Sequence, residues 1–293
     1  MKKITESKNP LSNTLDRMSV SEIVKLINKE DMQVPKIINK NLDIINIVIR
    51  NVIDSLRNNG RLFYIGCGTS GRLGVLDASE CPPTFKTDPS TVQGIIAGGY
   101  DALYKSIEGA EDSFSDGVEI VNKKNISQND SVIGISASGT AEYVLGALSE
   151  AKKVNAFTCL ITFNEISEKY SFVDQVISYN LGPEIISGST RLKSGTATKM
   201  ILNMISTTSM VKSNKVYKNY MVDLKVSNKK LKERALSIIC EITKLKRENS
   251  LKLLNEAKND VKIALVIHHC KISYNSARKL INSNNGNLRK ILE

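Results

Sequence analysis

The chain has 293 residues, of which 41% are hydrophobic and 24% charged, and its formal net charge is +11. These values are ordinary for a globular protein with a packed core, and they exclude a disordered chain, a collagen-like repeat and a disulfide-rich scaffold. No apolar run approaches the roughly 20 residues that span a bilayer, and residues 1–10 lack the apolar stretch of a secretory signal. We therefore expect a cytoplasmic protein that has no membrane partner.

The N-terminal part of the chain predicts helices followed by a buried strand. Residues 19–22 have the Ser-x-x-Glu spacing of a capping box. After Pro35, apolar residues recur at helical spacing as far as Asn58-Asn59-Gly60, which is a signal for a helix C-terminus. Residues 61–66 then form a short apolar run that ends in glycine, as a buried strand does.

Strand-like and helical segments alternate in the middle of the chain. Further strands are predicted at residues 91–97, 131–137, 156–162 and 173–178. Helices are predicted between them at 102–110, 114–122 and 141–154, and a long helix follows at 192–210. Strands separated by helix-length segments build a parallel sheet covered on both faces. The fold class is therefore predicted to be α/β, with a doubly wound parallel sheet.

Residues 229–293 predict a small helical bundle with a basic surface. Short helices are expected at 231–245, 248–256, 261–268, 273–281 and 287–292. This segment has 15 Lys and Arg against 6 Asp and Glu, whereas residues 1–228 have 26 against 24. The basic residues alternate with apolar ones, and Tyr274 is the only aromatic residue, which favours a solvated helical face over a nucleic-acid groove. We expect domains of residues 1–228 and 229–293, and no nucleic-acid partner.

The sequence has no pattern typical of a metal or redox centre. Its five cysteines are scattered and none forms a Cys-x-x-Cys pair. The two histidines, His268 and His269, add no zinc-ligand spacing. We expect reduced, mostly buried thiols and no bound metal.

A glycine-rich segment follows the strand predicted at residues 61–66. It reads GCGTSG at residues 66–71, which is the Gly-x-Gly-x-x-Gly spacing. A dinucleotide site with this spacing also needs an acidic residue at the end of the next strand, but the strand at 91–97 runs into Gly98-Gly99. Hydroxyls and backbone N–H groups at a helix start favour a phosphate monoester. A dinucleotide site and a purely structural glycine turn are the two alternatives.

Two more hydroxyl-rich segments precede predicted helices. SASGT at residues 136–140 ends the strand at 131–137, and GSTRLKSGT at 188–196 opens the long helix and adds two cations. Either segment alone is also explained as a helix N-terminal cap. Because ligands bind beyond the carboxyl ends of parallel strands, we predict a sugar-phosphate site. Its expected binding residues are Gly68, Thr69, Ser70, Gly71, Ser136, Ser138, Gly139, Thr140, Ser189 and Lys193.

Two glutamates are candidates for acid–base chemistry near this site. Glu80 lies in DASECPPT at residues 77–84, just before a Pro-Pro pair expected to end its helix. Glu111 lies in EGAED at residues 108–112, at the end of the helix predicted at 102–110. Either glutamate is also explained as a surface or capping residue. Two carboxylates near a phosphate pocket nevertheless suit a reaction in which one takes a proton and the other donates one.

These motifs together resemble the N-acetylmuramic acid 6-phosphate etherases, a family with the sugar isomerase (SIS) fold. The resemblance runs through TESKNP at 5–10, residues 61–85, IIAGG at 95–99, EGAED at 108–112, residues 188–207 and NYMVD at 219–223. It implies a carbon–oxygen lyase that removes D-lactate from N-acetylmuramic acid 6-phosphate and leaves N-acetylglucosamine 6-phosphate. It also implies a homodimer that needs no metal or redox cofactor.

The catalytic pair of that family falls on Glu80 and Glu111. By this resemblance, Glu111 is the base that takes the proton from C2, and Glu80 is the acid at the departing lactate oxygen on C3. One loop departs from the family pattern: residues 138–143 read SGTAEY, where the family usually has SGRTPY. This departure removes an arginine and a proline and adds the negative charge of Glu142 near the phosphate. The hydroxyl groups of the loop are kept, so we expect the activity to be retained, while the discrimination between sugars can differ.

Proteins with similar motifs have three other functions. A non-catalytic sugar-phosphate-binding regulator, like the glucokinase regulatory proteins, is about twice as long and has an internal repeat that is not seen here. A transcription regulator would need a basic helix-turn-helix at one end. An aldose–ketose isomerase would release no lactate. Lactate release therefore separates the etherase from all three alternatives.

Overall fold

The computed structural model describes residues 3–165 and 170–293, which divide into two compact units. The first unit contains the described residues up to Ser79 together with Ser90–Ser206. The second contains Glu80–Pro89 and Thr207–Glu293. Among the described residues, no helix is both long enough and apolar enough to cross a membrane.

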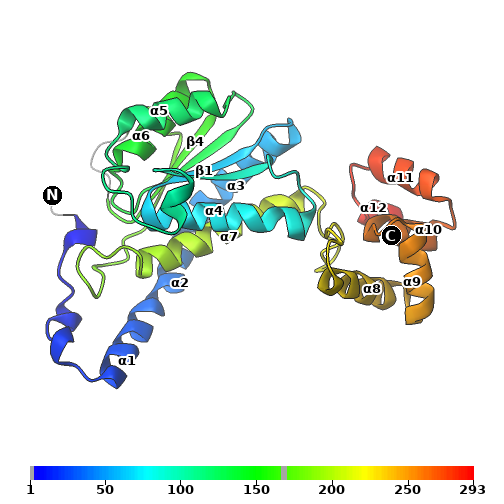
Figure 1. The fold of residues 1–293 in the computed structure, drawn as a ribbon, viewed down its shortest axis with the longest axis horizontal. Helices are drawn as coiled ribbons and strands as arrows, with labels where there is room; N and C mark the ends of the chain where they lie inside the picture. The colour runs from blue at the N-terminus through cyan, green and yellow to red at the C-terminus, as the bar shows by residue number, and fades with distance from the viewer. Residues whose placement is uncertain (1–2, 166–169) are drawn as a thin grey trace. The chain divides into compact units, whose positions relative to one another are not determined.

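A parallel sheet of five strands forms the centre of the first unit (Figure 1). The strands are β1 (Leu62–Gly66), β2 (Val92–Ile96), β3 (Ser131–Ile135), β4 (Phe157–Thr162) and β5 (Gln175–Ser178). Their order is β2-β1-β3-β4-β5, and Leu62 of β1 is in register with both Val92 and Ser131. Every residue of β1 and β3 is buried, as expected for strands covered on both faces. The predicted doubly wound α/β fold is confirmed.

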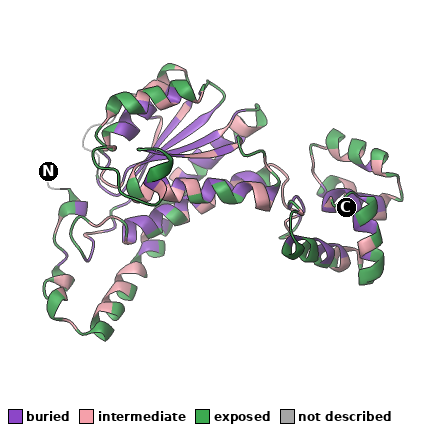
Figure 2. Ribbon diagram, in the orientation of Figure 1, coloured by how far each residue is buried: buried purple, intermediate pink, exposed green. Residues whose placement is uncertain are grey.

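Helices cover the two faces of this sheet (Figure 1). Helices α5 (Phe114–Lys123) and α6 (Glu142–Lys153) lie on one face, and α3 (Asp43–Arg57), α4 (Gly68–Phe85) and α7 (Lys193–Lys212) lie on the other. Val75 of α4 lies against Gly94 of β2, and Val144 of α6 lies against Gly134 of β3. Figure 2 shows the resulting pattern, with buried strands between helices whose outer faces are exposed.

The N-terminal helices follow the prediction in part. They are α1 (Val20–Asp31) and α2 (Gln33–Ile38), with 3-10 turns at Ile4–Glu6, Pro10–Ser12, Leu15–Arg17 and Asn39–Asn41. The predicted capping box is confirmed, because Ser19 Oγ accepts the Glu22 N–H at 3.4 Å and Glu22 Oε2 accepts the Ser19 N–H at 2.8 Å. The apolar stripe after Pro35 is divided between α2 and α3 by the turn at Asn39–Asn41.

The prediction of a helix at residues 102–110 is wrong. Only a 3-10 turn forms there, at Tyr100–Leu103, and the chain continues as a loop to α5. Gly98, Gly99 and Gly109 have φ values of 82°, 73° and 72°, in the left-handed region that favours glycine. The Arg72 guanidinium fixes the loop by donating to the carbonyl oxygens of Leu103 (3.1 Å) and Lys105 (3.0 Å). Glu111 therefore lies in a loop and not at a helix end.

The end of α4 also differs from the prediction. The Pro82-Pro83 pair does not stop the helix, which continues through both prolines to Phe85. Proline has a φ close to the helical value, so its cost is the loss of backbone donors in this last turn. The final turn is closed by the Lys86 N–H, which donates to the Pro82 carbonyl at 3.0 Å.

The second unit contains a bundle of short helices. They are α8 (Lys229–Thr243), α9 (Arg247–Glu256), α10 (Val261–Cys270), α11 (Tyr274–Ser283) and α12 (Arg289–Leu292), close to the predicted positions. Helix α10 is buried from Val261 through Ile267 and packs against the other four helices. The division of the chain into domains of residues 1–228 and 229–293 remains a prediction.

Candidate functional site

The order of the strands defines where a ligand can bind in the first unit. The connection from β1 leads to β2 on one side, and the chain continues from β3 to β4 on the other. The segments after β1 and β3 therefore diverge and leave a crevice beyond the carboxyl ends of these two strands. A cavity of about 380 Å³ lies there, and residues from both hydroxyl-rich segments line it. We call it the β1–β3 cavity. It is lined by Lys3, Glu6, Cys67–Ser70, Glu111, Ile135–Ser138, Thr140, Ala141, Gly188 and Thr190.

The segment after β1 presents the start of α4 to the cavity. Gly68 opens the helix with a φ of 50°, and Thr69 and Ser70 follow on its first turn. N–H groups on the first turn of a helix have no partner within the helix, so they are available to an anion. Gly71 does not line the cavity, and a Cβ at this position would be 2.6 Å from the Gly66 carbonyl oxygen. This glycine lets the helix start approach the strand end closely.

The segment after β3 is a loop held by its own hydroxyls. Ser136 Oγ accepts the Ala141 N–H at 3.2 Å, and Ser138 Oγ lies 3.4 Å from Ser136 Oγ and 3.0 Å from Thr140 Oγ1. The three hydroxyls therefore face one another along the cavity wall. Gly139 does not line the cavity, but its φ of 77° allows the loop to turn.

The N-terminal segment lies against this cavity, which the sequence did not predict. Lys3 Nζ donates to Thr140 Oγ1 at 2.7 Å, and Lys3 and Glu6 both line the cavity. Thr5, between them, is fixed from two distant parts of the chain. Its N–H donates to Asn164 Oδ1 at 3.2 Å, and its carbonyl oxygen accepts the Gly188 N–H at 3.0 Å. The one available signal was TESKNP, a polar segment near the N-terminus that matches the family pattern.

Glu111 lines the same cavity as the hydroxyl loops. Its backbone is held in place because the Tyr143 N–H at the start of α6 donates to the Glu111 carbonyl oxygen at 3.0 Å. Its carboxylate lies close enough to Cys67 to affect that thiol. Burial, and then the negative charges of Glu111 and Asp112, raise the pKa of Cys67 to about 12. The predicted base and the predicted phosphate-binding segments are thus brought together.

Glu80 does not line the β1–β3 cavity. It is exposed on α4, ten residues after Ser70 on the same helix, which corresponds to about 15 Å along the helix axis. Within one chain, Glu80 is therefore well removed from the turn that opens α4.

The segment at residues 188–196 contributes less than predicted. Gly188 and Thr190 line the cavity, but Ser189 and Lys193 do not. The Lys193 side chain is 5% exposed, and its Nζ lies 2.6 Å from Glu30 Oε2 and 3.0 Å from the Leu181 carbonyl oxygen. The buried Glu184 carboxylate accepts the Lys193 and Ser194 N–H groups at 3.0 and 2.9 Å. The Glu184 carboxylate therefore occupies the start of α7, and the Lys193 and Ser194 N–H groups are not available to a phosphate.

The charges around the β1–β3 cavity are few and of both signs. Among the described residues that line it, Lys3 is the only cation, and Glu6 and Glu111 are the two carboxylates. The arrangement offers hydroxyls, backbone N–H groups and one ammonium to a phosphate, with a carboxylate close by for proton transfer. Within residues 3–165 and 170–293, no three His, Cys, Asp or Glu side chains form a group that could hold a metal.

Comparisons with known proteins identify several similar chains. The N-acetylmuramic acid 6-phosphate etherase of Clostridium beijerinckii is 46% identical over 289 residues, which covers 99% of this chain and 95% of that relative. N-acetylmuramic acid 6-phosphate etherase 1 of Bacillus licheniformis is also 46% identical, over 98% of this chain and 95% of its own. Among solved structures, the phosphoheptose isomerase GmhA of Neisseria gonorrhoeae matches with a TM-score of 0.44 and 14% identity, over 64% of this chain and 100% of its own.

Two domain families match parts of the chain. The N-terminal SIS domain of glucokinase regulatory protein matches residues 44–152, and the C-terminal lid domain of the same protein matches residues 218–262. The first match includes β1, β2, β3 and the segments that follow them, and the second includes the start of the helical bundle.

Proposed function

Because this chain belongs to the N-acetylmuramic acid 6-phosphate etherase family, we propose that the β1–β3 cavity is the place where it holds its sugar phosphate. The protein is a carbon–oxygen lyase of cell-wall recycling, which cleaves the D-lactyl ether of N-acetylmuramic acid 6-phosphate. The observation that carries the proposal is that Glu111 lines the same cavity as the hydroxyl segments after β1 and β3.

The phosphate group is held at the carboxyl ends of β1 and β3 in this proposal. The first-turn N–H groups of α4 and the hydroxyls of Thr69 and Ser70 approach it from one side, and Ser136, Ser138 and Thr140 approach it from the other. The Lys3 ammonium, which lies 2.7 Å from Thr140 Oγ1, supplies positive charge for the phosphate dianion. In this arrangement Gly71 and Gly139 shape the two segments, and Lys193 serves the packing of α7 through Glu30.

The reaction proceeds by elimination and then hydration. Opening of the sugar ring exposes an aldehyde at C1, which acidifies the hydrogen on C2. Glu111 takes that proton as a base, the C3–O bond breaks, and protonated Glu80 gives its proton to the departing lactate oxygen. Water then adds to C3 of the resulting double bond, and a proton returns to C2. The sum is one water consumed, with D-lactate and N-acetylglucosamine 6-phosphate released.

A homodimer forms part of this proposal. The exposed Glu80 lies about 15 Å along α4 from Ser70, and it does not line the β1–β3 cavity. In a symmetric dimer each copy offers the same surface to the other, so Glu80 of each copy can face the cavity of its partner. We place the reaction in the cytoplasm, and the five free cysteines of the chain fit a reducing compartment.

A release assay with paired variants tests the role of Glu111. The purified protein is incubated with N-acetylmuramic acid 6-phosphate, and D-lactate is measured. Glu111→Gln removes the proposed base, so we expect kcat to fall by about 100-fold or more. Glu108→Gln is the matched control, because Glu108 is an exposed carboxylate of the same loop that does not line the β1–β3 cavity. Equal kcat values for the two variants would contradict the assignment of Glu111.

A further inference from the structure

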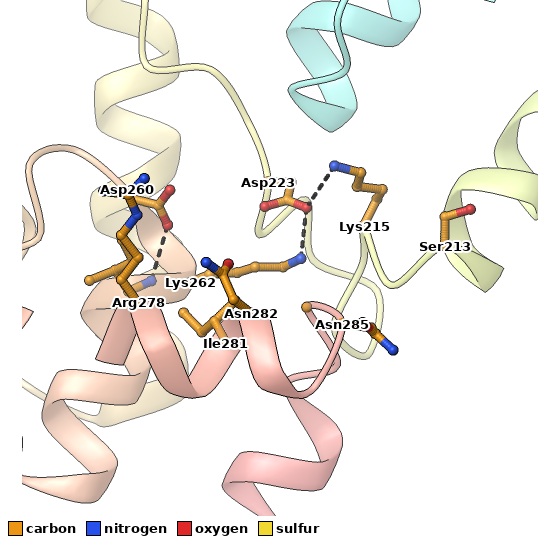
Figure 3. Close-up of a pocket in the computed structure, with 11 residues that line it drawn as sticks. Ser213, Lys215, Asp223, Asp260, Lys262, Arg278, Ile281, Asn282 and Asn285 are labelled. Atoms are coloured by element: carbon orange, nitrogen blue, oxygen red, sulfur yellow. Dashed lines mark hydrogen bonds and ion pairs between the residues drawn. The ribbon is translucent and has the colours of Figure 1, made fainter. Parts of the chain in front are cut away.

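The second unit contains a separate cavity of about 460 Å³, which lies between α10, α11 and the segment that follows α7 (Figure 3). We call it the α10–α11 cavity. Ligand pockets are typically about 300–1,000 Å³, so it is large enough for a small organic anion. Its charged and amide-bearing lining residues are Lys215, Asp223, Asp260, Lys262, Arg278 and Asn282, together with Asn285.

A buried lysine lies at the base of this cavity. Lys262 belongs to α10, and only 7% of its side chain is exposed. Its Nζ donates to Asp223 Oδ2 and to the Asn214 carbonyl oxygen, both at 2.7 Å. Burial lowers the pKa of Lys262, and the Asp223 carboxylate opposes that effect. Because an ammonium has three N–H donors, one remains for a ligand after these two bonds.

The loop before α12 leaves room at this ammonium. Gly286 has a φ of 75°, and a Cβ built on it would lie 3.2 Å from Lys262 Nζ. Any larger residue at position 286 would therefore be strained and would press on the charged group. The backbone thus approaches the lysine closely while the cavity side stays open.

Positive charges outnumber negative charges around the cavity. Asp223 Oδ2 lies between two lysines, 2.7 Å from Lys262 Nζ and 3.5 Å from Lys215 Nζ, as Figure 3 shows. Asp260 forms an ion pair with Lys86 at 2.7 Å. Arg278, exposed on α11, has no ion pair or hydrogen bond within the part of the chain that the structure describes. The lining residues alone are three cations and two carboxylates, with a net charge of +1, and Lys86, which pairs with Asp260 from outside the lining, raises the local net charge to +2.

We propose that the α10–α11 cavity is a binding site for a phosphate monoester dianion. A charge of −2 balances the combined excess of the lining groups and Lys86, and the planar guanidinium of Arg278 can hold two phosphate oxygens at once. The Lys262 ammonium and the Asn282 amide supply further donors. The two carboxylates in the wall disfavour a long polyanion such as a nucleic acid, because its further phosphates would meet them. Every lining residue belongs to the second unit, and none is a catalytic candidate.

Calorimetric titration of the full chain tests this site without any turnover, so its result is independent of the catalytic proposal. Inorganic phosphate and N-acetylglucosamine 6-phosphate are each titrated at constant ionic strength. The wild type should bind two phosphate groups per chain, one in each cavity. Arg278→Gln should weaken one of the two binding events by about tenfold or more and leave the other unchanged. Lys279→Gln is the matched control, because Lys279 is the next cation on α11 and does not line the cavity.

The two ligands distinguish the possible sources of the phosphate. Binding of both at the site affected by Arg278→Gln means that the phosphate group alone is recognised, and binding of the sugar phosphate alone means that the sugar also contributes. Lys215→Gln should weaken the same event, and it leaves Asp223 paired with Lys262. A single binding event in the wild type that Arg278→Gln leaves unchanged would overturn the proposal. Identical titrations of Arg278→Gln and Lys279→Gln, or binding of an oligonucleotide in place of phosphate, would also overturn it.

Discussion

Lys3 brings a positive charge to a cavity that otherwise has two carboxylates among its charged, described lining residues. Its ammonium donates to Thr140 Oγ1, at the position where the family resemblance implies the arginine of SGRTPY. Lys3 thus supplies a cation to a loop, residues 136–141, that has none of its own. We infer that Lys3 binds the phosphate equally in the ground state and in the transition state, because the phosphate does not react.

Lys3→Gln should therefore raise KM for N-acetylmuramic acid 6-phosphate by about tenfold and leave kcat nearly unchanged. Steady-state D-lactate release measures both values. Lys8→Gln is the control, because Lys8 is an exposed cation of the same segment that does not line the cavity. Adding Thr140→Arg to the Lys3→Gln variant should restore KM. An unchanged KM in Lys3→Gln would show that the contact with Thr140 is only structural.

Asp77 is a buried carboxyl on α4 that ties this helix to α7. Its Oδ1 accepts from Asn203 Nδ2 at 2.7 Å and from Ser206 Oγ at 3.2 Å. Burial raises the pKa of Asp77, and the hydrogen bonds from Asn203, Ser206 and Tyr64 oppose this rise. Because the folded-state pKa is above the unfolded one, the folded state binds the proton more tightly. The stability that this group contributes is complete in acid and is lost as the pH rises from about 4 through the raised pKa.

Asp77→Asn should remove that loss, because the amide is neutral at every pH and its oxygen still accepts both bonds. The difference in unfolding free energy, variant minus wild type, should become more positive as the pH rises above about 4. Urea unfolding at several pH values measures this difference. Asp101→Asn is the control, because hydrogen bonds from Lys105 and Tyr104 lower the pKa of Asp101. For this variant, the difference in unfolding free energy should become more negative as the pH rises. A difference for Asp77→Asn that falls with pH would contradict this account.

Elements with a local signal could be predicted, and those set by distant contacts could not. The capping box at Ser19 and the buried strand β1 are encoded within a few residues, and both are present. The loop after Tyr100–Leu103 is different, because its carbonyls are held by Arg72, roughly thirty positions earlier in the chain. The three left-handed glycines in this region were visible in the sequence and argued against a helix there.

The same rule separates the predicted from the unpredicted residues of the candidate site. Thr69, Ser70, Ser136 and Ser138 follow strand ends, and the strand-end rule placed them together. Lys3 and Glu6 reach the cavity only because Asn164 and Gly188 hold Thr5 between them. Lys193 was expected to face the ligand, but it is turned inward by Glu30, which lies far from it in the sequence. Contacts between residues far apart in the chain produce no periodic pattern in the sequence, so they could not be predicted from it.

The two candidate glutamates occupy different positions relative to α4. Glu111 lines the cavity at the start of this helix, whereas Glu80 is exposed on the same helix ten residues after Ser70. In the proposed mechanism, a second copy of the chain brings Glu80 to the cavity. A symmetric dimer has two such sites, each with Glu111 from one copy and Glu80 from the other.

Dimers built from two differently tagged chains test this arrangement. In a dimer of Glu80→Gln with Glu111→Gln, one site keeps both glutamates and the other keeps neither, so D-lactate release should be about half that of the wild type. Each variant alone should be inactive. A dimer of the wild type with a chain carrying both substitutions is the matched control. It has no complete site if the glutamates come from different copies, and it should therefore be inactive. If each chain instead used its own pair, the outcomes would be reversed, because the first dimer would be inactive and the control would retain about half of the activity.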